Sequence, residues 1–156
     1  MTTGSYVQLF DNFYYGIHPA IVDPILDIDI YFYLTEPHQA EVYTNCQYYY
    51  EYPIIDRQAI SVRKLRALVK SIMKELKQGH SVYIACKGGH GRSGLVAGAV
   101  LAFVKGWDYP LTKQYLQQEW EQQRKLETPQ TKIQKAQLLK YCEYLSQKKR
   151  RINDIS

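Results

Sequence analysis

The clearest pattern in the chain is a short apolar stretch, a glycine-rich loop and a second apolar stretch in direct succession. Val82 to Ala85 is uninterrupted and rich in β-branched and aromatic residues, which predicts a buried strand. Leu95 to Val104 is apolar on every side, which is typical of a helix packed inside a core. The residues between them include four glycines, so the chain can turn sharply from the strand into the helix.

Upstream of this stretch, alternating and β-branched runs predict further strands. Aromatic and aliphatic runs on both sides of an Asp11-Asn12 turn predict a hairpin, and two later runs predict single strands. The expected strands cover Tyr6–Phe10, Phe13–Tyr15, Ile28–Leu34 and Val42–Tyr50. His18 to Leu26 is compatible with a short helix interrupted by Pro24.

Three amphipathic helices are expected besides the buried one. Ser61 is a good N-cap for a helix with apolar positions from Val62 to Leu76, which ends at Gly79. Asp108 and Pro110 open a helix through about Arg124 that packs Leu111, Tyr115, Leu116 and Trp120. The apolar stripe expected for the last helix is Ile133, Ala136, Leu139, Cys142 and Leu145.

Length and composition limit the class of protein. The 156 residues suffice for one well-cored domain, which we place at 1–147, followed by a basic tail at 148–156. The longest apolar run has ten residues, whereas a transmembrane helix needs about 20. No signal peptide is apparent, and three irregularly spaced cysteines favour a reducing compartment over a disulfide framework. We therefore expect a cytoplasmic protein; the basic tail is also compatible with a nuclear location.

Three kinds of phosphate-binding loop are compatible in part with residues 86–94. A Walker loop would need glycine where Cys86 stands and lysine where Arg92 stands. The dinucleotide fingerprint G-x-G-x-x-G is present at residues 89–94, but no second parallel strand with a terminal acid follows. The third pattern is C-x5-R-[ST], and each of its positions has a chemical role in binding or attacking a phosphoryl group. This is the interpretation that we adopt.

The chemistry of this third pattern is nucleophilic attack on a bound phosphoryl group. Inward-facing N–H groups, the N-terminus of the following helix and Arg92 together favour the thiolate form of Cys86. The planar guanidinium of Arg92 can hold two phosphoryl oxygens. The Ser93 hydroxyl can hydrogen-bond the sulfur and ease its departure. The loop itself supplies the phosphate cradle, from Lys87, Gly88, Gly89, His90, Gly91 and Arg92.

The sequence from Cys86 to Gly94 resembles the signature loop of the cysteine-dependent protein tyrosine and dual-specificity phosphatases. Tyr52 to Asp56 is similar to the mobile loop that carries the general acid of that family, and Gln130 to Gln134 is similar to its glutamine loop. The resemblance implies that Asp56 protonates the leaving group and that Gln130 positions the hydrolytic water. Glu51 and Glu41 are weaker candidates for the acid. The expected fold is one α/β domain with a short, mixed and partly parallel sheet and helices on both sides.

The resemblance also implies the reaction and its substrates. We expect phosphomonoester hydrolysis through a cysteinyl-phosphate, without metal or organic cofactor, on proteins phosphorylated at tyrosine, serine or threonine. Lys87 and His90 keep a phosphoinositide or RNA 5′-phosphate open as an alternative, because a highly anionic substrate would benefit from added positive charge. No feature of the sequence requires nucleic acid as a partner. A non-catalytic module that binds phosphoproteins is the alternative of another class.

Two departures from the family pattern concern the active cysteine. Ala85 stands where the family usually has a histidine, which there helps to orient the loop. Cys46 is a candidate for a protective disulfide with oxidised Cys86, as in some relatives, but we favour a packed strand cysteine, because free cysteines are commonly buried.

Overall fold

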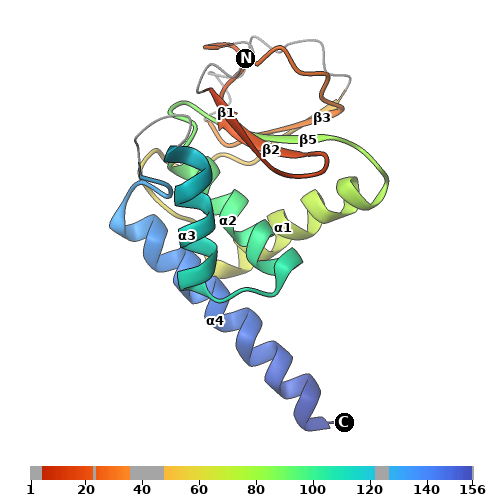
Figure 1. The fold of residues 1–156 in the computed structure, drawn as a ribbon, viewed down its shortest axis with the longest axis vertical. Coiled ribbons are helices and arrows are strands. Elements are labelled where there is room, and N and C mark those ends of the chain that lie inside the picture. The colour runs from red at the N-terminus through yellow and green to blue at the C-terminus, as the bar shows by residue number, and fades with distance from the viewer. Residues whose placement is uncertain (1–4, 23, 36–47, 122–126, 156) are drawn as a thin grey trace.

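The computed structural model describes residues 5–22, 24–35, 48–121 and 127–155 as five strands and four helices. The strands are β1 (Tyr6–Phe10), β2 (Phe13–Ile17), β3 (Ile30–Tyr33), β4 (Tyr48–Glu51) and β5 (Val82–Cys86). The helices are α1 (Val62–Lys77), α2 (Arg92–Lys105), α3 (Tyr109–Glu121) and α4 (Lys132–Ile155) (Figure 1). The predicted α/β class and the order of its main elements are confirmed.

The strands form one mixed sheet in the order β1-β2-β5-β3-β4. The predicted hairpin is confirmed, since β1 pairs with β2 in antiparallel register. The pairs β2–β5, β5–β3 and β3–β4 are all parallel, so the carboxyl ends of these four strands meet at one edge. Loops at this edge of a parallel sheet are the usual place for a ligand site.

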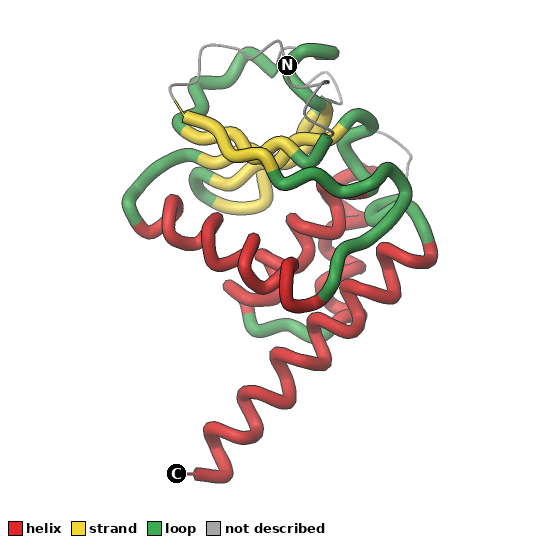
Figure 2. Tube along the Cα trace, turned by 180° about the vertical axis from the view of Figure 1, so that it is seen from behind, coloured by secondary structure: helices red, strands yellow, loops and turns green. Residues whose placement is uncertain are grey.

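The two faces of the sheet are covered differently. Alternate residues such as Phe32, Ile84 and Val82 face the main core, where the described helices pack against the sheet (Figure 2). Tyr31, Tyr33, Tyr83 and Ala85 face the other side and form a small aromatic cluster. The described helices therefore lie on one face, whereas the sequence analysis expected them on both.

Helix α2 lies at the centre of the core. Its residues from Arg92 to Ala102 are buried, and α1, α3 and α4 all pack around it. A Cβ at Gly98 would lie 2.8 Å from Leu138, which shows how closely α4 approaches α2. The caps match the prediction: Ser61 accepts the Lys64 N–H, and Asp108 accepts the Leu111 N–H.

Several sequence expectations differ from the structure. The described part of 18–26 forms turns instead of a helix, and most of the expected strand 42–50 lies outside the described residues. In α3, Leu111 is exposed, while Leu116 and Trp120 are buried as expected. Helix α4 continues to Ile155, through the segment that we expected to be a tail. The boundary at 147/148 stays a prediction.

The apolar stripe predicted for α4 was wrong at Ile133, Ala136 and Leu139, whereas Cys142 is buried and Leu145 packs against the core as expected. Ile133 and Leu139 are 50% and 40% exposed, whereas Gln134, Leu138 and Tyr141 are buried. Residues three apart lie about 60° short of a full turn, so a stripe at constant spacing of three drifts around the helix. The buried face follows the mixed spacing of three and four residues, and it includes two glutamines.

Among the described residues, no helix has the length and apolar character needed to cross a bilayer.

Candidate active site

The candidate nucleophile and its loop lie at the carboxyl edge of the parallel strands. Cys86 is the last residue of β5, and Arg92 is the first residue of α2, so residues 87–91 form the whole connection. The Cys86 side chain is buried, and its Sγ accepts the backbone N–H of Ser93 at 3.4 Å. Gly91 caps α2 without a side-chain hydrogen bond, so no capping side chain competes with an anion at the N-terminus of the helix.

One glycine fixes the path of the loop. Gly89 has φ = 80°, and a Cβ there would lie 2.6 Å from the Ile17 nitrogen at the end of β2. Only glycine combines this left-handed conformation with so close an approach. The loop is therefore seated against the strand next to β5, and its position is set by backbone contacts.

Arg92 connects the loop to two other segments. Its side chain is only 2% exposed, and Nη1 donates to the Ile54 carbonyl at 3.0 Å and to the Leu34 carbonyl at 3.5 Å. Its Nη2 lies 3.5 Å from Oδ1 of Asp56. The predicted acid and the predicted phosphate-binding cation thus lie side by side, although 36 positions separate them in the sequence.

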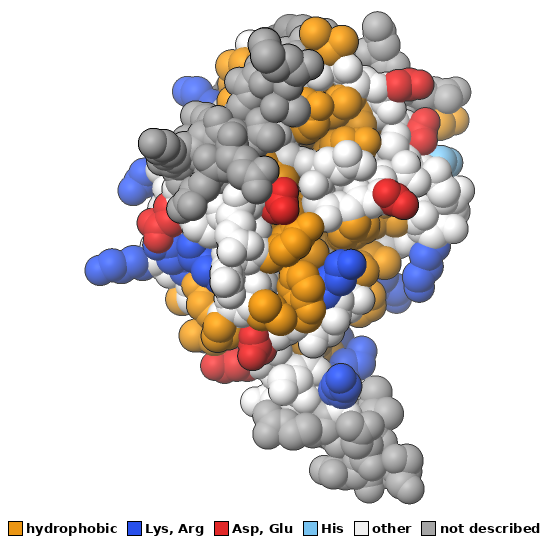
Figure 3. Space-filling view, viewed as in Figure 1, with side chains coloured by type: hydrophobic (Ala, Val, Ile, Leu, Met, Phe, Trp, Pro, Cys, Tyr) orange, Lys and Arg blue, Asp and Glu red, His pale blue; other side chains and the backbone are white. Residues whose placement is uncertain are grey.

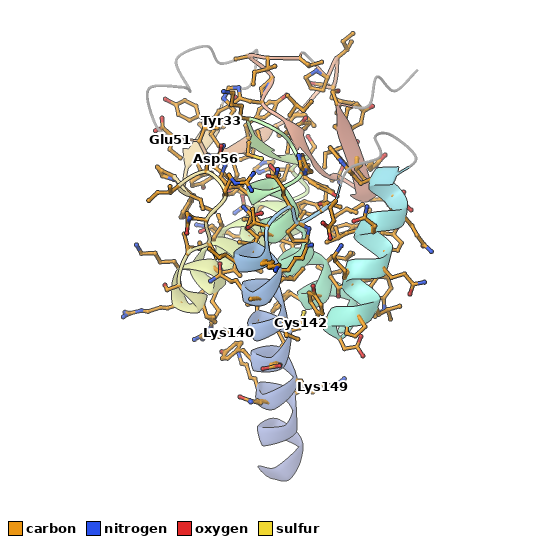
Figure 4. The ribbon with its side chains drawn as sticks, turned by 90° about the vertical axis from the view of Figure 1, so that its left-hand side faces the viewer. Tyr33, Glu51, Asp56, Lys140, Cys142 and Lys149 are labelled. Carbon is orange, nitrogen blue, oxygen red and sulfur yellow. The ribbon has the colours of Figure 1, made fainter. Side chains whose placement is uncertain are left out.

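Asp56 lies on a more exposed segment that α4 holds in place. Its side chain is 64% exposed and lies above the N-terminal end of α4 (Figure 4). Three side chains of the glutamine loop and the first turns of α4 bind the backbone that follows Asp56. Thr131 Oγ1 donates to Arg57 O at 3.0 Å, Gln134 Nε2 donates to Gln58 O at 3.2 Å, and Gln137 Oε1 accepts Ile60 N–H at 2.9 Å.

Gln130 lies close to the phosphate loop, at Gly91. A Cβ at Gly91 would lie 3.2 Å from Oε1 of both Gln130 and Gln134. Gln134 Oε1 also accepts the N–H groups of Gln130 and Thr131 at 3.2 and 3.1 Å. One buried glutamine therefore joins the glutamine loop to the Asp56 segment, a role that the sequence analysis did not assign to Gln134.

The two basic residues of the loop face different ways. Lys87 is exposed, whereas His90 is largely buried and its Nδ1–H donates to the Glu127 carbonyl at 2.8 Å. The His90 ring also stacks loosely on Trp120, at 6.3 Å between centroids. His90 therefore supports the wall of the site, and Lys87 is the loop cation that faces solvent.

Ser93 and Ala85 also differ in detail from the expectation. The Ser93 hydroxyl donates to the Gly16 carbonyl at 3.5 Å, so in this state the backbone N–H, and not the hydroxyl, meets the sulfur. Ala85 packs within the aromatic cluster beside Tyr33. The nearby His18 donates its backbone N–H to the Cys86 carbonyl at 2.8 Å and stacks on Tyr33, and burial lowers the pKa of its ring.

The remaining candidates lie away from Cys86 or outside the described residues. Glu51 lies at the end of β4 and is exposed, while Glu41 and Cys46 lie outside the described part of the chain. Cys142 is buried in α4, and burial raises the pKa of its thiol to about 11, so it stays protonated at neutral pH. Within the described ranges, no three His, Cys, Asp or Glu side chains are arranged to hold a metal ion.

Comparison with known proteins identifies the family of this chain. Residues 28–149 match the family described as PTP-SAK, Swiss Army Knife protein, DSP-PTPase phosphatase domain. The chain belongs to this family. Among curated proteins, none has a significant sequence match to it.

Solved phosphatase structures share the fold of this DSP-PTPase domain. Tk-PTP in its active form has a TM-score of 0.73 and 23% identity, covering 89% of this chain and 97% of that chain. PTPMT1 in complex with PI(5)P has a TM-score of 0.72 and 13% identity, covering 92% and 97%. Human DUSP28 has a TM-score of 0.68 and 17% identity, covering 90% and 95%.

Proposed function

We propose that this domain hydrolyses phosphomonoesters by two successive displacements at phosphorus. The observation that carries the proposal is the meeting of three groups at one edge of the sheet. A buried sulfur lies at the N-terminus of α2, and Arg92 and Asp56 lie 3.5 Å from each other beside it. A nucleophile, an oxyanion holder and a proton donor are the minimum set for phosphoryl transfer through an enzyme thiol.

In the first displacement, the Cys86 thiolate attacks phosphorus along the line opposite the leaving oxygen. An S–P bond forms as the P–O bond to the leaving group breaks. The amides of residues 87–92 and the Arg92 fork hold the three remaining oxygens. Asp56, in its protonated form, gives its proton to the departing alkoxide or phenoxide.

In the second displacement, water releases the phosphate. Gln130 holds the water over the loop, and the Asp56 carboxylate accepts its proton as the oxygen attacks phosphorus. The S–P bond breaks, and the sulfur leaves as a thiolate that the Ser93 N–H stabilises. Rotation of the Ser93 side chain away from Gly16 would add its hydroxyl as a second donor.

Phosphorylated proteins are the substrates that we favour, with phosphotyrosine, phosphoserine and phosphothreonine all accepted. The description of the family as DSP-PTPase supports this choice. A phosphoinositide is the second candidate, since PTPMT1 was solved with PI(5)P and Lys87 is exposed on the loop. A reduced Cys86 is required, which agrees with a reducing compartment such as the cytoplasm.

The test is phosphate release from an aryl phosphate by the wild-type chain and by Cys86→Ser. We expect Cys86→Ser to abolish turnover and Cys142→Ser, the matched control, to retain it. Absence of turnover in the wild type, with binding of a phosphopeptide retained, would instead support the non-catalytic module. A panel of phosphotyrosine and phosphoserine peptides, PI(5)P and 5′-phosphorylated RNA then ranks the substrates.

A further inference from the structure

A concave surface lies between α1 and the middle of α4. Its volume is about 860 Å³, and its apolar lining includes Met73, Phe103, Tyr144 and Leu145. Phe103 is 46% exposed and directly follows the buried part of α2, which ends at Ala102. We call this surface the α1/α4 groove.

The α1/α4 groove is remote from the candidate active site. Phe103 lies near the C-terminal end of α2, whereas Arg92 is the first residue of the same helix. Eleven residues of helix correspond to about 16 Å along the axis. Beyond the groove, α4 extends past the other elements, in the region of Lys149 (Figures 1 and 4). Substitutions in the groove can therefore be made without touching Cys86, Arg92 or Asp56.

The rim of the α1/α4 groove is entirely basic. Five cations follow one another along α1 at spacings of three and four residues, and one comes from α4. They are Arg63, Arg66, Lys70, Lys74, Lys77 and Lys148. Among the described lining residues none is acidic, and none of the six cations forms an ion pair with another described residue. On the face seen in Figure 3, by contrast, Asp and Glu lie among Lys and Arg.

Such a row of like charges is unfavourable for an isolated helix. Cations at i and i+4 repel one another, and the free energy of the helix rises with each pair. The one compensating contact described at the groove is the Arg66 guanidinium over the Tyr144 ring, at 4.3 Å from its centroid. A bound acidic ligand would remove the repulsion along α1, so the charge of the groove indicates the charge of its occupant.

The shape of the groove limits the kind of acidic ligand. An apolar floor beside the basic row of α1, with Lys148 on the α4 side, matches a helix with one apolar stripe and acidic residues along its edges. Nucleic acid offers no aliphatic side chains to cover Met73 and Leu145, and a bilayer surface is flat where this surface is hollow. A second copy of this chain, with net charge +5, would bring further positive charge. We propose that the α1/α4 groove binds an acidic amphipathic helix of a partner protein.

The test uses a synthetic probe of the proposed chemistry. The probe is a fluorescein-labelled helical peptide with leucine at i, i+3, i+4 and i+7 and glutamate on both flanks, and its control carries glutamine in place of glutamate. Fluorescence anisotropy measures binding to the full chain. We expect saturable binding of the acidic probe that weakens with salt and is at least about 10-fold tighter than binding of the control.

Variants of the protein distinguish binding of the probe in the groove from attraction by the net positive charge of the chain. Lys70→Glu/Lys74→Glu should weaken binding at least about 10-fold, and Lys105→Glu/Lys140→Glu, with the same charge change at two lysines that do not line the groove, less than about 3-fold. Phe103→Ala should weaken it about 5-fold, because the apolar contact is lost. Turnover of a small aryl phosphate and the melting temperature serve as controls and should stay near wild-type values.

Several results would overturn the proposal, whether or not the chain is a phosphatase. Equal weakening by the two charge-reversal pairs would mean that net charge alone attracts the probe. An unchanged affinity of Phe103→Ala, or no binding to wild type at about 100 μM, would exclude an apolar docking site for such a helix. Tighter, Phe103-dependent binding to vesicles of 3:1 phosphatidylcholine and phosphatidylserine, to a 20-nucleotide RNA, or to a second copy in sedimentation would assign the groove to that ligand instead.

Discussion

The phosphate loop and the Asp56 segment meet at Arg92, yet they are held in different ways. The loop from Cys86 to Arg92 is seated against β2 by backbone contacts, as the close approach of Gly89 to Ile17 shows. The Asp56 segment is more exposed and is held by side chains of the glutamine loop and α4. In the proposed mechanism, binding and nucleophilic attack would therefore depend on backbone geometry, whereas proton transfer would depend on a few replaceable side chains.

This difference predicts which substitutions act on every substrate and which act on some. A change in the phosphate loop removes groups that hold the phosphoryl oxygens, so turnover of all phosphomonoesters should fall. A change in the support of Asp56 alters protonation of the leaving group, so its cost should grow as the leaving group becomes more basic. Leaving-group dependence is therefore the measurement that separates the two regions.

The largest effect is expected from Arg92, which belongs to both regions. Arg92→Lys keeps one positive charge but loses the fork that holds two oxygens, and it cannot reach Ile54 O and Asp56 in the same geometry. We expect kcat/KM to fall about 10³-fold for both p-nitrophenyl and phenyl phosphate. Stopped assays of phosphate release measure both substrates. A loss confined to phenyl phosphate would contradict a role of Arg92 in holding the transferred group.

The next largest effect is expected from Asp56→Asn. Phenyl phosphate releases a phenoxide like that of tyrosine, whose phenol has a pKa of about 10, and here kcat should fall about 10²-fold. The more acidic p-nitrophenol needs little help from a proton donor, so its loss should be several-fold smaller. Glu51→Gln, on the strand before Asp56, is the matched control and should leave both rates unchanged. Equal losses for the two substrates would remove Asp56 from the role of general acid.

The sequence was most informative where a local pattern and the chemistry coincide. The strand, loop and helix from Val82 to Val104 were predicted because their apolar pattern and glycines depend on neighbours in the chain. The proximity of Asp56 to Arg92 could be expected only through the resemblance, because no spacing rule relates a loop residue to a helix residue 36 positions away.

Contacts between segments that are far apart in the chain could not be predicted from the sequence. Gln134 and Gln137 bind backbone groups 76 and 77 positions away, and buried glutamines leave no periodic apolar signal. The only signal in the sequence was that Gln134 and Gln137 lie three residues apart in a predicted helix. Such a polar pair normally indicates a solvent-exposed face, so this signal did not predict their burial. The sequence also did not show what would cover each face of the sheet. The tyrosines of β3 and β5 cover one face without a described helix, whereas we expected helices on both faces.

A smaller effect is expected where α4 holds the Asp56 segment. Gln137→Met removes the acceptor of the Ile60 N–H, which lies outside the phosphate loop. We expect kcat for phenyl phosphate to fall about 3- to 10-fold, since a displaced acid spends less time in reach of the leaving oxygen. The same substitution in the Asp56→Asn background should cost almost nothing if it acts through Asp56. A full additional loss in that background would mean that Gln137 acts elsewhere.

The smallest effect on catalysis is expected from a substitution of Glu75, which connects α1 to β4 by a hydrogen bond. Tyr50 donates to Glu75 at 2.8 Å, and His80 Nδ1 lies 2.9 Å from the other carboxylate oxygen. Burial favours a raised pKa for Glu75, but the hydrogen bonds of His80 and Tyr50 outweigh it, so the pKa of Glu75 lies below its ordinary value of 4.5.

A carboxyl group whose pKa is lowered in the folded state stabilises the fold above its unfolded pKa, and that stability disappears as the pH falls through the folded value. Glu75→Gln should therefore lower the free energy of unfolding by about 1 to 2 kcal/mol at pH 7, measured by urea unfolding, and the difference should shrink below pH 4.5. Because α4 rather than β4 holds Asp56, the rate ratio of phenyl to p-nitrophenyl phosphate should stay unchanged. A changed ratio would show that the acid also depends on β4, and the division between the two regions would then fail.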